Sequence, residues 1–320
     1  MSTTAVDELR LTAPAKINLY LQVTGRRPDG YHLLATLMQK IGLFDRLVLQ
    51  RGAAGISLSC PDSGLPEDEG NIVYRAARLF LATMAERAAG SLPGVKITLY
   101  KSIPVAAGLG GGSSDAAAVL CGLDKLFGTR CPVRELLAMG VSLGADVPLF
   151  VVDWPVAWAT GIGDRLQPAA ALADVDILLV NPGFSVSTSW VYERFALTAA
   201  ENIFNLSNLQ KGNAGAGEGH EFTQRPIRPD ELRNDLERVT ADRYAEIGIL
   251  KERLLKGGAA AALMSGSGPS VFGLFPKKGG SGQAEACFRD LARDYDNTFL
   301  VPPLQQAYDI ELPEWGVVKW

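Results

Sequence analysis

The chain has 320 residues, of which 47% are hydrophobic and 21% are charged, the proportions of a folded globular protein with a large core. A domain usually has roughly 100 to 200 residues, so two domains are expected, at residues 1–165 and 166–320. The 31 Lys and Arg against 35 Asp and Glu leave a net charge of −4, which supplies no overall positive field to attract nucleic acid or an anionic membrane, so any anionic ligand must be held locally.

Strands are expected over most of the first 60 residues, followed by a helix. The RRPDG segment at 26–30 supplies turn residues within the run of strands. From Ile72 to Met84, apolar side chains recur at helical spacing. The candidate strands are LRLTA (9–13), INLYLQVTG (17–25), YHLLATLMQKIGL (31–43), DRLVLQ (45–50) and ISLSC (56–60).

The remaining elements again mix strands and helices, which predicts an α+β fold. After a strand at 95–100 come a glycine-rich loop, a helix from about Gly112 to Phe127 and another from about Val133 to Leu143, with Asp146 just beyond. The stretch from about 207 to 230 is rich in Gly, Pro and polar residues and is expected to be a mobile surface insertion. The second half also contains candidate strands at 174–180, 260–264 and 270–275 and candidate helices at 190–195 and around 243–256.

The cysteines and histidines suggest neither a metal site nor a disulfide framework. They are Cys60, Cys121, Cys131, Cys287, His32 and His220, and no C-x-x-C pair occurs. The N-terminus lacks an export signal, and the apolar stretch at 147–159 is interrupted by Asp153 and Pro155 and is too short to span a bilayer. We therefore expect a cytoplasmic protein with no membrane partner and no nucleic-acid partner. Its oligomeric state stays open.

The strongest functional signal is the glycine-rich segment PVAAGLGGGSSDAAAVL, which lies between a strand and an Ala-rich helix. Glycine permits positive φ and close approach of the backbone to a phosphate, and a helix start adds free N–H groups and the positive end of the dipole. Asp115 is expected to complement that dipole from the first turn. The predicted ATP-binding residues are Pro104, Val105, Ala106, Ala107, Gly108, Leu109, Gly110, Gly111, Gly112, Ser113 and Ser114.

The spacing of these glycines excludes two common nucleotide-binding fingerprints. A dinucleotide-binding pattern would need glycine at 113, and a Walker A loop would need lysine after Gly112. The structural alternative is a turn that only packs a helix against a sheet.

Three motifs, in order and spacing, resemble those of the GHMP kinases, named for galacto-, homoserine, mevalonate and phosphomevalonate kinases. The glycine-rich loop resembles their second motif, the segment at 13–39 their first, and LMSGSGPSVFGLF at 263–275 their third. The resemblance covers most of residues 11–303, but not the loose region from about 198 to 233 or the tail from 305. It implies an N-terminal nucleotide-binding and catalytic domain like ribosomal S5 domain 2. It also implies a C-terminal ferredoxin-like domain that binds substrate, with the site in the cleft between them.

Within this superfamily, Lys16, Asn18, DGYH at 29–32 and GADVPLF at 144–150 resemble the branch whose acceptor carries a cytidine diphosphate group. The resemblance implies transfer of the ATP γ-phosphoryl group to the tertiary 2-hydroxyl of a cytidylyl sugar-alcohol phosphate, in non-mevalonate isoprenoid biosynthesis. Asp146 is implied to orient and deprotonate this hydroxyl, with Lys16 stabilising charge beside it. Without the motifs, Lys16 would be interpreted as a solvated strand residue and Asp146 as a turn aspartate.

The resemblance also implies how the base is recognised. Tyr31 and His32 offer an aromatic face and a hydrogen-bonding ring at adjacent positions, and Tyr192 is the best positional match for a second stacking aromatic. Asn18 is assigned to the same pocket. The structural alternatives are that Tyr31 and His32 pack a hairpin and that Tyr192 is a core residue.

Magnesium is expected as the cofactor because it bridges nucleotide phosphates in this chemistry. It is expected to arrive with ATP, since no carboxylate cluster in the sequence marks an all-protein metal site. The SGSGPS segment at 265–270 is expected to support the glycine-rich loop rather than to contact phosphate. Three alternatives remain: another kinase of the superfamily that acts on homoserine, mevalonate or a sugar, a non-catalytic nucleotide sensor, and a dinucleotide-dependent oxidoreductase. Retention of Lys16 and Asp146 argues against the sensor, and the position of the loop past residue 100 argues against the oxidoreductase.

Overall fold

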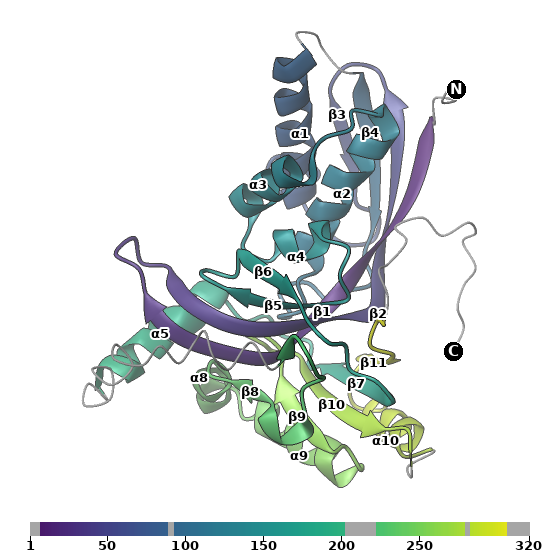
Figure 1. Cartoon of the computed structure of the whole chain (residues 1–320). Helices are drawn as coiled ribbons and strands as arrows, with labels where there is room; N and C mark the ends of the chain where they lie inside the picture. The colour runs from purple at the N-terminus through teal and green to yellow at the C-terminus, as the bar shows by residue number, and fades with distance from the viewer. Residues whose placement is uncertain (1–6, 89–92, 202–221, 279–281, 306–320) are drawn as a thin grey trace.

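Two sheets joined by a long antiparallel hairpin organise the computed structural model, which describes residues 7–88, 93–201, 222–278 and 282–305. Figure 1 shows the hairpin passing between an upper layer of helices and sheet and a lower sheet with its own helices. Within the described residues the larger sheet has seven strands and the smaller has four. The mixture of helices and strands in two units confirms the α+β two-domain expectation.

The hairpin consists of β1 (Glu8–Arg26) and β2 (His32–Gly52), paired in register from Glu8 opposite Gln50 to Arg26 opposite His32. Each strand was expected as two separate segments and is continuous instead. Three register irregularities, one of them between Pro14 and Ala15, interrupt the alternation that the sequence interpretation relied on. Such bulges bend a strand without ending it.

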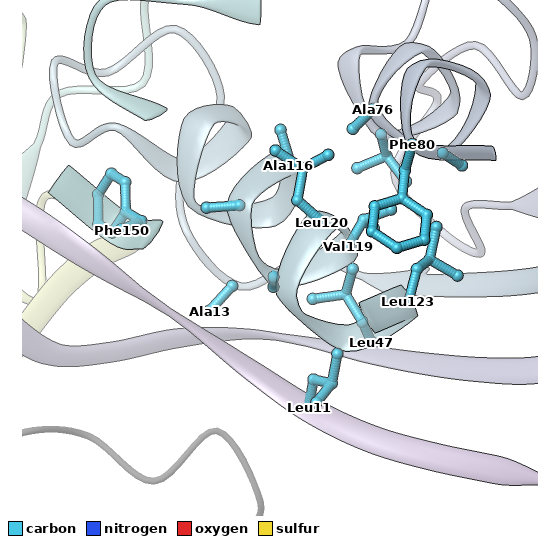
Figure 2. Packing of buried hydrophobic residues seen from close by; sticks show 14 of the residues in the cluster. Leu11, Ala13, Leu47, Ala76, Phe80, Ala116, Val119, Leu120, Leu123 and Phe150 are labelled. Atoms are coloured by element: carbon cyan, nitrogen blue, oxygen red, sulfur yellow. The ribbon is translucent and has the colours of Figure 1, made fainter. Parts of the chain in front are cut away.

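The N-terminal unit packs helices on the sheet through small and aliphatic side chains. Figure 2 shows Val119, Leu120 and Leu123 of α2 between the strand residues Leu11 and Leu47 on one side and Phe80 of α1 on the other. A Cβ at Gly122 would lie 2.4 Å from Leu11, so this helix lies very close to the sheet. The elements are β3 (Ile56–Ser59), α1 (Ile72–Ala88), β4 (Gly94–Tyr100), α2 (Gly111–Phe127), α3 (Val133–Leu143) and α4 (Val147–Val151).

The C-terminal unit has the strand order β11-β7-β10-β9, with each pair antiparallel. Together with its helix positions, this is the ferredoxin-like β-α-β-β-α-β arrangement, as expected. None of the described helices combines the length and apolar composition needed to cross a membrane. The elements are β7 (Val175–Asn181), α5 (Thr188–Glu201), α8 (Glu237–Arg243), α9 (Glu246–Lys256), β9 (Ala261–Met264), β10 (Val271–Pro276), α10 (Gln283–Leu291) and β11 (Asn297–Val301).

Alternate residues of β7 face two different cores. Ile177 and Leu179 pack against hairpin residues such as Ile17 and Leu37 in a cluster that we call the inter-sheet core. The neighbouring Leu178 and Val180 pack with α9 and α10. Both faces of the C-terminal sheet are therefore buried, and one of them is buried against the other unit.

Short strands cross the predicted boundary at residue 165. β5 (Val156–Thr160) pairs with β6 (Arg165–Pro168) in the larger sheet, and β8 (Arg233–Asn234), just after the 3-10 helix η1 (Pro229–Glu231), pairs with β1. The division at 165 stays a prediction.

The segment expected to be a mobile insertion lies partly outside the described residues, because 207–221 are not among them. For 222–230 the expectation is wrong. Phe222 is buried, with its ring centroid 5.8 Å from that of Tyr20 and 5.6 Å from that of Trp158, and Ile227 is buried as well. Two apolar anchors among polar residues fix this part of the chain to the larger sheet.

Candidate active site

A cavity of about 970 Å³ opens between the two units and gathers side chains that are far apart in sequence. It is lined by the hairpin, the glycine-rich loop, the start of α1, the residues before α4 and the start of α5. The predicted site residues that line it are Lys16, Asn18, Tyr31, His32, Asp146, Tyr192 and residues 104–113. Ser114 is the one predicted site residue that does not line it.

The glycine-rich loop is held by its carbonyl groups. The Leu109 carbonyl accepts a bond from the Lys16 amide at 2.9 Å, the Gly108 carbonyl from the Ser265 hydroxyl at 3.0 Å, and the Ala107 carbonyl from the Ser270 amide at 3.3 Å. The support expected from residues 265–270 is therefore present. Gly266 and Ser267 of the same segment also line the cavity.

The loop conformation requires glycine at two positions. Gly108 and Gly110 have φ values of +77° and +69°, in the left-handed region that costs other residues energy. A Cβ at Gly108 would lie 2.2 Å from the Ser265 carbonyl oxygen. Gly110 caps α2, so the next three amides have no acceptor within the helix. This arrangement suits an anion at the start of α2.

Lys16 and Asp146 lie together in the cavity. The Lys16 Nζ is 3.5 Å from the Asp146 Oδ2 and donates to the Asn18 Oδ1 at 2.6 Å. The Lys16 side chain is 4% exposed and that of Asp146 38% exposed. Asp146 precedes α4 but makes no side-chain cap bond to it. One buried cation thus lies beside a carboxylate that remains accessible from the cavity.

Asn18 was expected beside Tyr31 and His32, but it contacts Lys16 instead. Its Nδ2 donates to the Thr36 Oγ1 at 2.9 Å, and its amide donates to the Ser265 Oγ at 3.2 Å. These bonds orient the carbonyl that accepts from Lys16. The structure therefore brings Asn18 to Lys16 and not to Tyr31 and His32.

Aromatic side chains form the other end of the cavity. The rings of His32 and Tyr192 stack, with centroids 5.0 Å apart and planes 25° from parallel, while Tyr31 is 62% exposed at the hairpin turn. Burial, and to a smaller degree the charge of Arg26, lowers the pKa of His32. Burial, and then the charge of Asp146, raises the pKa of Tyr192. Both rings are therefore neutral at neutral pH.

Two residues at the start of α2 differ from expectation. Ser114 is 1% exposed and faces a second, smaller cavity. Asp115 was expected to complement the helix dipole, but it is a buried residue past the first turn, with its Oδ2 2.8 Å from the Lys101 Nζ. Successive helical side chains point about 100° apart, so the motif alone does not indicate which of them face a ligand.

The sequence interpretation missed part of the cavity. Asn71, Ile72 and Arg75 line it from the start of α1, and Lys101 lines it from the end of β4. None of the first three belongs to a recognised motif. The lysine three residues before Pro104 was the available signal, because it puts a cation close to the glycine-rich loop.

The cavity offers a few hard oxygen donors for a metal ion. Within the described residues, no three His, Cys, Asp or Glu side chains gather as a metal site. The Asp146 carboxylate and the Ser113 hydroxyl both belong to residues that line the cavity. Such a donor set fits Mg²⁺, which usually binds one or two carboxylates together with phosphates and water.

Two family descriptions match this chain, and named relatives resemble it over most of its length. The description "GHMP kinases N terminal domain" matches residues 71–153, and "GHMP kinases C terminal" matches 222–294. A protein of Syntrophus aciditrophicus (strain SB) named 4-diphosphocytidyl-2-C-methyl-D-erythritol kinase is 46% identical over 280 residues, covering 87% of this chain and 93% of its own. A Geobacter sulfurreducens protein of the same name is 43% identical over 285 residues, covering 89% and 96%.

Solved structures give a consistent result. A crystal structure of 4-(cytidine 5'-diphospho)-2C-methyl-D-erythritol kinase superposes with a TM-score of 0.69 at 35% identity, covering 92% of this chain and 98% of its own. A homoserine kinase from Cytophaga hutchinsonii superposes with a TM-score of 0.66 at 18% identity, covering 96% and 98%. At that low identity the second likeness concerns the fold alone.

Proposed function

The chain belongs to the GHMP kinases, in the group named 4-diphosphocytidyl-2-C-methyl-D-erythritol kinases, and from that premise we propose that it phosphorylates this cytidylyl alcohol with ATP. The γ-phosphoryl group passes to the 2-hydroxyl of the acceptor, the bond to the β-phosphate oxygen breaks, and ADP leaves. The reaction is a step of isoprenoid precursor synthesis in the cytoplasm, in keeping with four cysteines that are all free thiols.

One observation carries the proposal: the Lys16–Asp146 pair lies in the same cavity as the start of α2 and the His32–Tyr192 stack. A nucleotide at the helix start directs its terminal phosphate into the cavity that holds this pair. An acceptor whose base lies at the aromatic end extends its alcohol toward the same pair. The cavity therefore has one end for each substrate.

Asp146 and Lys16 divide the work of the transfer. Asp146 accepts a hydrogen bond from the acceptor hydroxyl, orients its lone pair toward the γ-phosphorus and takes the proton as the new bond forms. Lys16, held in place by Asn18, stabilises negative charge on the carboxylate and on the transferring group. Because the transition state of phosphoryl transfer is loose in most analyses, positioning and electrostatics supply most of the acceleration.

Base recognition falls to the aromatic end. A neutral imidazole carries one N–H donor and one acceptor nitrogen on opposite sides of the ring, so one of them can bond to a donor or an acceptor on the edge of cytosine. His32 therefore reads the base, and the exposed ring of Tyr31 supplies a stacking face. Tyr192 packs against His32 and fixes the orientation of its ring. The role of Tyr192 as a second aromatic that stacks on the base stays a prediction.

Magnesium is the cofactor that we propose, with Asp146 and Ser113 as the protein groups nearest to it. Asp146 and Ser113 would hold the ion together with the nucleotide, and the ion would neutralise negative charge on the phosphates.

Asp146→Asn provides the direct test. The asparagine keeps the shape of the side chain but cannot take a proton, so kcat should fall by about a hundredfold to ten-thousandfold. Steady-state kinetics with the cytidylyl alcohol and ATP measure the loss, and circular dichroism checks that the variant folds. A kcat near that of the wild type would remove Asp146 from the mechanism.

Acceptor choice separates this proposal from other GHMP kinase activities. Homoserine, mevalonate and galactose lack a cytosine base, so they should be phosphorylated far more slowly than the cytidylyl alcohol at equal concentration. ADP release with each acceptor measures this preference. Faster turnover of any of the three would replace the proposed substrate.

A further inference from the structure

A second cavity, of about 200 Å³, lies on the other side of the first turn of α2 from the nucleotide site. It shares no lining residue with the larger cavity, and the neighbours Ser113 and Ser114 line one cavity each. Phe150 lines the smaller cavity, and its ring lies 3.1 Å from the position of a Cβ at Gly110. The two cavities are thus back to back across the glycine-rich loop.

Lys40 is a buried cation at this second cavity. It is 4% exposed, and its Nζ donates to the Val152 carbonyl at 2.9 Å and lies 5.8 Å from the centroid of the Phe150 ring. In the part of the chain that the structure describes, no carboxylate forms an ion pair with it. Lys40 also stands directly opposite Lys16 on the hairpin, and like charges in that position are destabilising. Lys16 has Asp146 as its counter-charge, whereas the charge of Lys40 has no comparable partner among those residues.

Burial lowers the pKa of Lys40 to about 8, with the charge of Asp153 acting in the opposite direction. The amine therefore still carries its proton at neutral pH. An ammonium group has three donors, and the bond to Val152 uses one of them. Two N–H donors remain for a ligand.

Ser114 supplies a second unmatched group. Its hydroxyl is buried and has no hydrogen-bond partner among the described residues. Buried hydroxyls in native proteins almost always have a partner. The exposed Lys125 and Asp153 also line this cavity and bear opposite charges. The buried ammonium of Lys40 therefore makes the interior of the cavity positive.

We propose that this cavity binds a small oxyanion through the Lys40 ammonium and the Ser114 hydroxyl. An oxyanion provides a counter-charge for the buried cation and accepts the unmatched O–H at the same time. The volume of the cavity suits inorganic phosphate or a small carboxylate with a few waters, since one water occupies about 30 Å³ of liquid. The inference does not depend on the substrate of the nucleotide site.

Thermal unfolding of the full chain with added anion tests the site. Phosphate could also bind at the start of α2, so the nucleotide cavity is first saturated with a non-hydrolysable ATP analogue and Mg²⁺. Sodium phosphate and sodium acetate are then titrated separately at ionic strength held constant with sodium chloride. A ligand that binds only the folded chain raises Tm in a saturable manner. A rise with phosphate alone identifies phosphate as the ligand, and a rise with acetate alone identifies a carboxylate.

Two variants assign the response to this cavity. Lys40→Met keeps the aliphatic stem and removes the charge, and replacing a buried charge by an apolar group is often well tolerated. The half-saturating anion concentration should rise at least about tenfold in Lys40→Met, the loss expected for a charged hydrogen bond. It should rise several-fold in Ser114→Ala. An anion response that is equal in the wild type and Lys40→Met, or a wild type that responds no more than to sodium chloride, would overturn the proposal.

Discussion

Lys101 lies between two buried carboxylates, Asp45 and Asp115, beneath the start of α2. Its Nζ donates to both, and the distance to the Asp115 Oδ2 is 2.8 Å. The Asp45 Oδ1 also accepts the amides of Ser102 and Ile103 at 2.6 and 2.9 Å, whereas the Asp115 Oδ1 has no partner among the described residues. One ammonium carries a single positive charge and does not neutralise two buried carboxylates. Asp115 is the less well satisfied of the two.

Burial raises the pKa of Asp115 to about 8, opposed by the charge of Lys101 and reinforced by that of Asp45. The unfolded chain releases this proton near pH 4. Between these values the folded state binds more protons than the unfolded state, so this residue's contribution to stability falls as pH rises.

Asp115→Asn should remove that loss. From pH 6 to pH 8, the free energy of unfolding of the variant minus that of the wild type should increase, by at most about 1.4 kcal/mol per pH unit. Urea titrations at several pH values measure the difference. Asp242→Asn, an exposed aspartate on α8, is the matched control and should show no trend. A constant difference for Asp115→Asn would mean that Asp115 is ionised in the folded chain throughout this range.

At the scale of single residues, the sequence predicted which site residues lie close together. It predicted less well the surroundings of each individual side chain. The proximity of Lys16 and Asp146 followed from the motifs, and the structure brings them together. Asp115 is paired with Lys101, which follows β4, and Ser114 lines the smaller cavity together with Lys40 of β2. No local pattern encodes such long-range partners.

At the scale of elements, the turn at Gly108 ties the glycine-rich loop to the C-terminal sheet. The Ser265 hydroxyl reaches the Gly108 carbonyl, and there is no room for a side chain between the two segments. Gly108 therefore serves both the loop conformation and the contact between the two units.

Gly108→Ala should destabilise the chain more than an alanine at an equally left-handed but open position. Gly183 is that position, with φ of +86° and no atom within 4 Å of the place that a Cβ would occupy. Gly183→Ala should cost about 1–2 kcal/mol for backbone strain alone, and Gly108→Ala at least about 1–3 kcal/mol more for the clash. Chemical denaturation measures both, and the KM for ATP should rise only in Gly108→Ala. Equal losses in the two variants would show that the loop can move away from Ser265.

Two helices beside the glycine-rich loop were predicted more closely than the long strands β1 and β2. The helix expected at residues 133–143 is observed with those bounds, and α2 begins one residue before its expected start. Apolar side chains at helical spacing are a local signal that packing rarely changes over several turns. The strands β1 and β2 run through bulges and through Pro14 and Gly42, so their continuity depends on pairing with each other.

At the scale of the whole molecule, the inter-sheet core joins both units. Ile17 and Leu37 of the hairpin pack with Ile177, Leu179 and Phe272 of the C-terminal sheet, and all five are fully buried. Removing one unit would expose this surface on the other. Neither unit keeps a complete core when it is alone.

The chain should therefore unfold in a single transition despite its two-domain architecture. Calorimetry should give one peak whose calorimetric enthalpy equals the van't Hoff enthalpy. Leu179→Ala, in the inter-sheet core, should lower the Tm of this one peak without splitting it. Two separate peaks in the wild type would show that the units are energetically independent.

The continuous pairing of β1 and β2 also has a consequence for acceptor size. Lys16 lies in the middle of this hairpin and His32 at its far end, so in the proposed mechanism the span from the reacting alcohol to the base follows one continuous pair of strands. An acceptor that carries cytosine on a linker shorter by one phosphate could occupy either end of the site but not both at once. On this proposal, selection should act on molecular length as well as on chemical identity, and free cytidine nucleotides should bind without being phosphorylated.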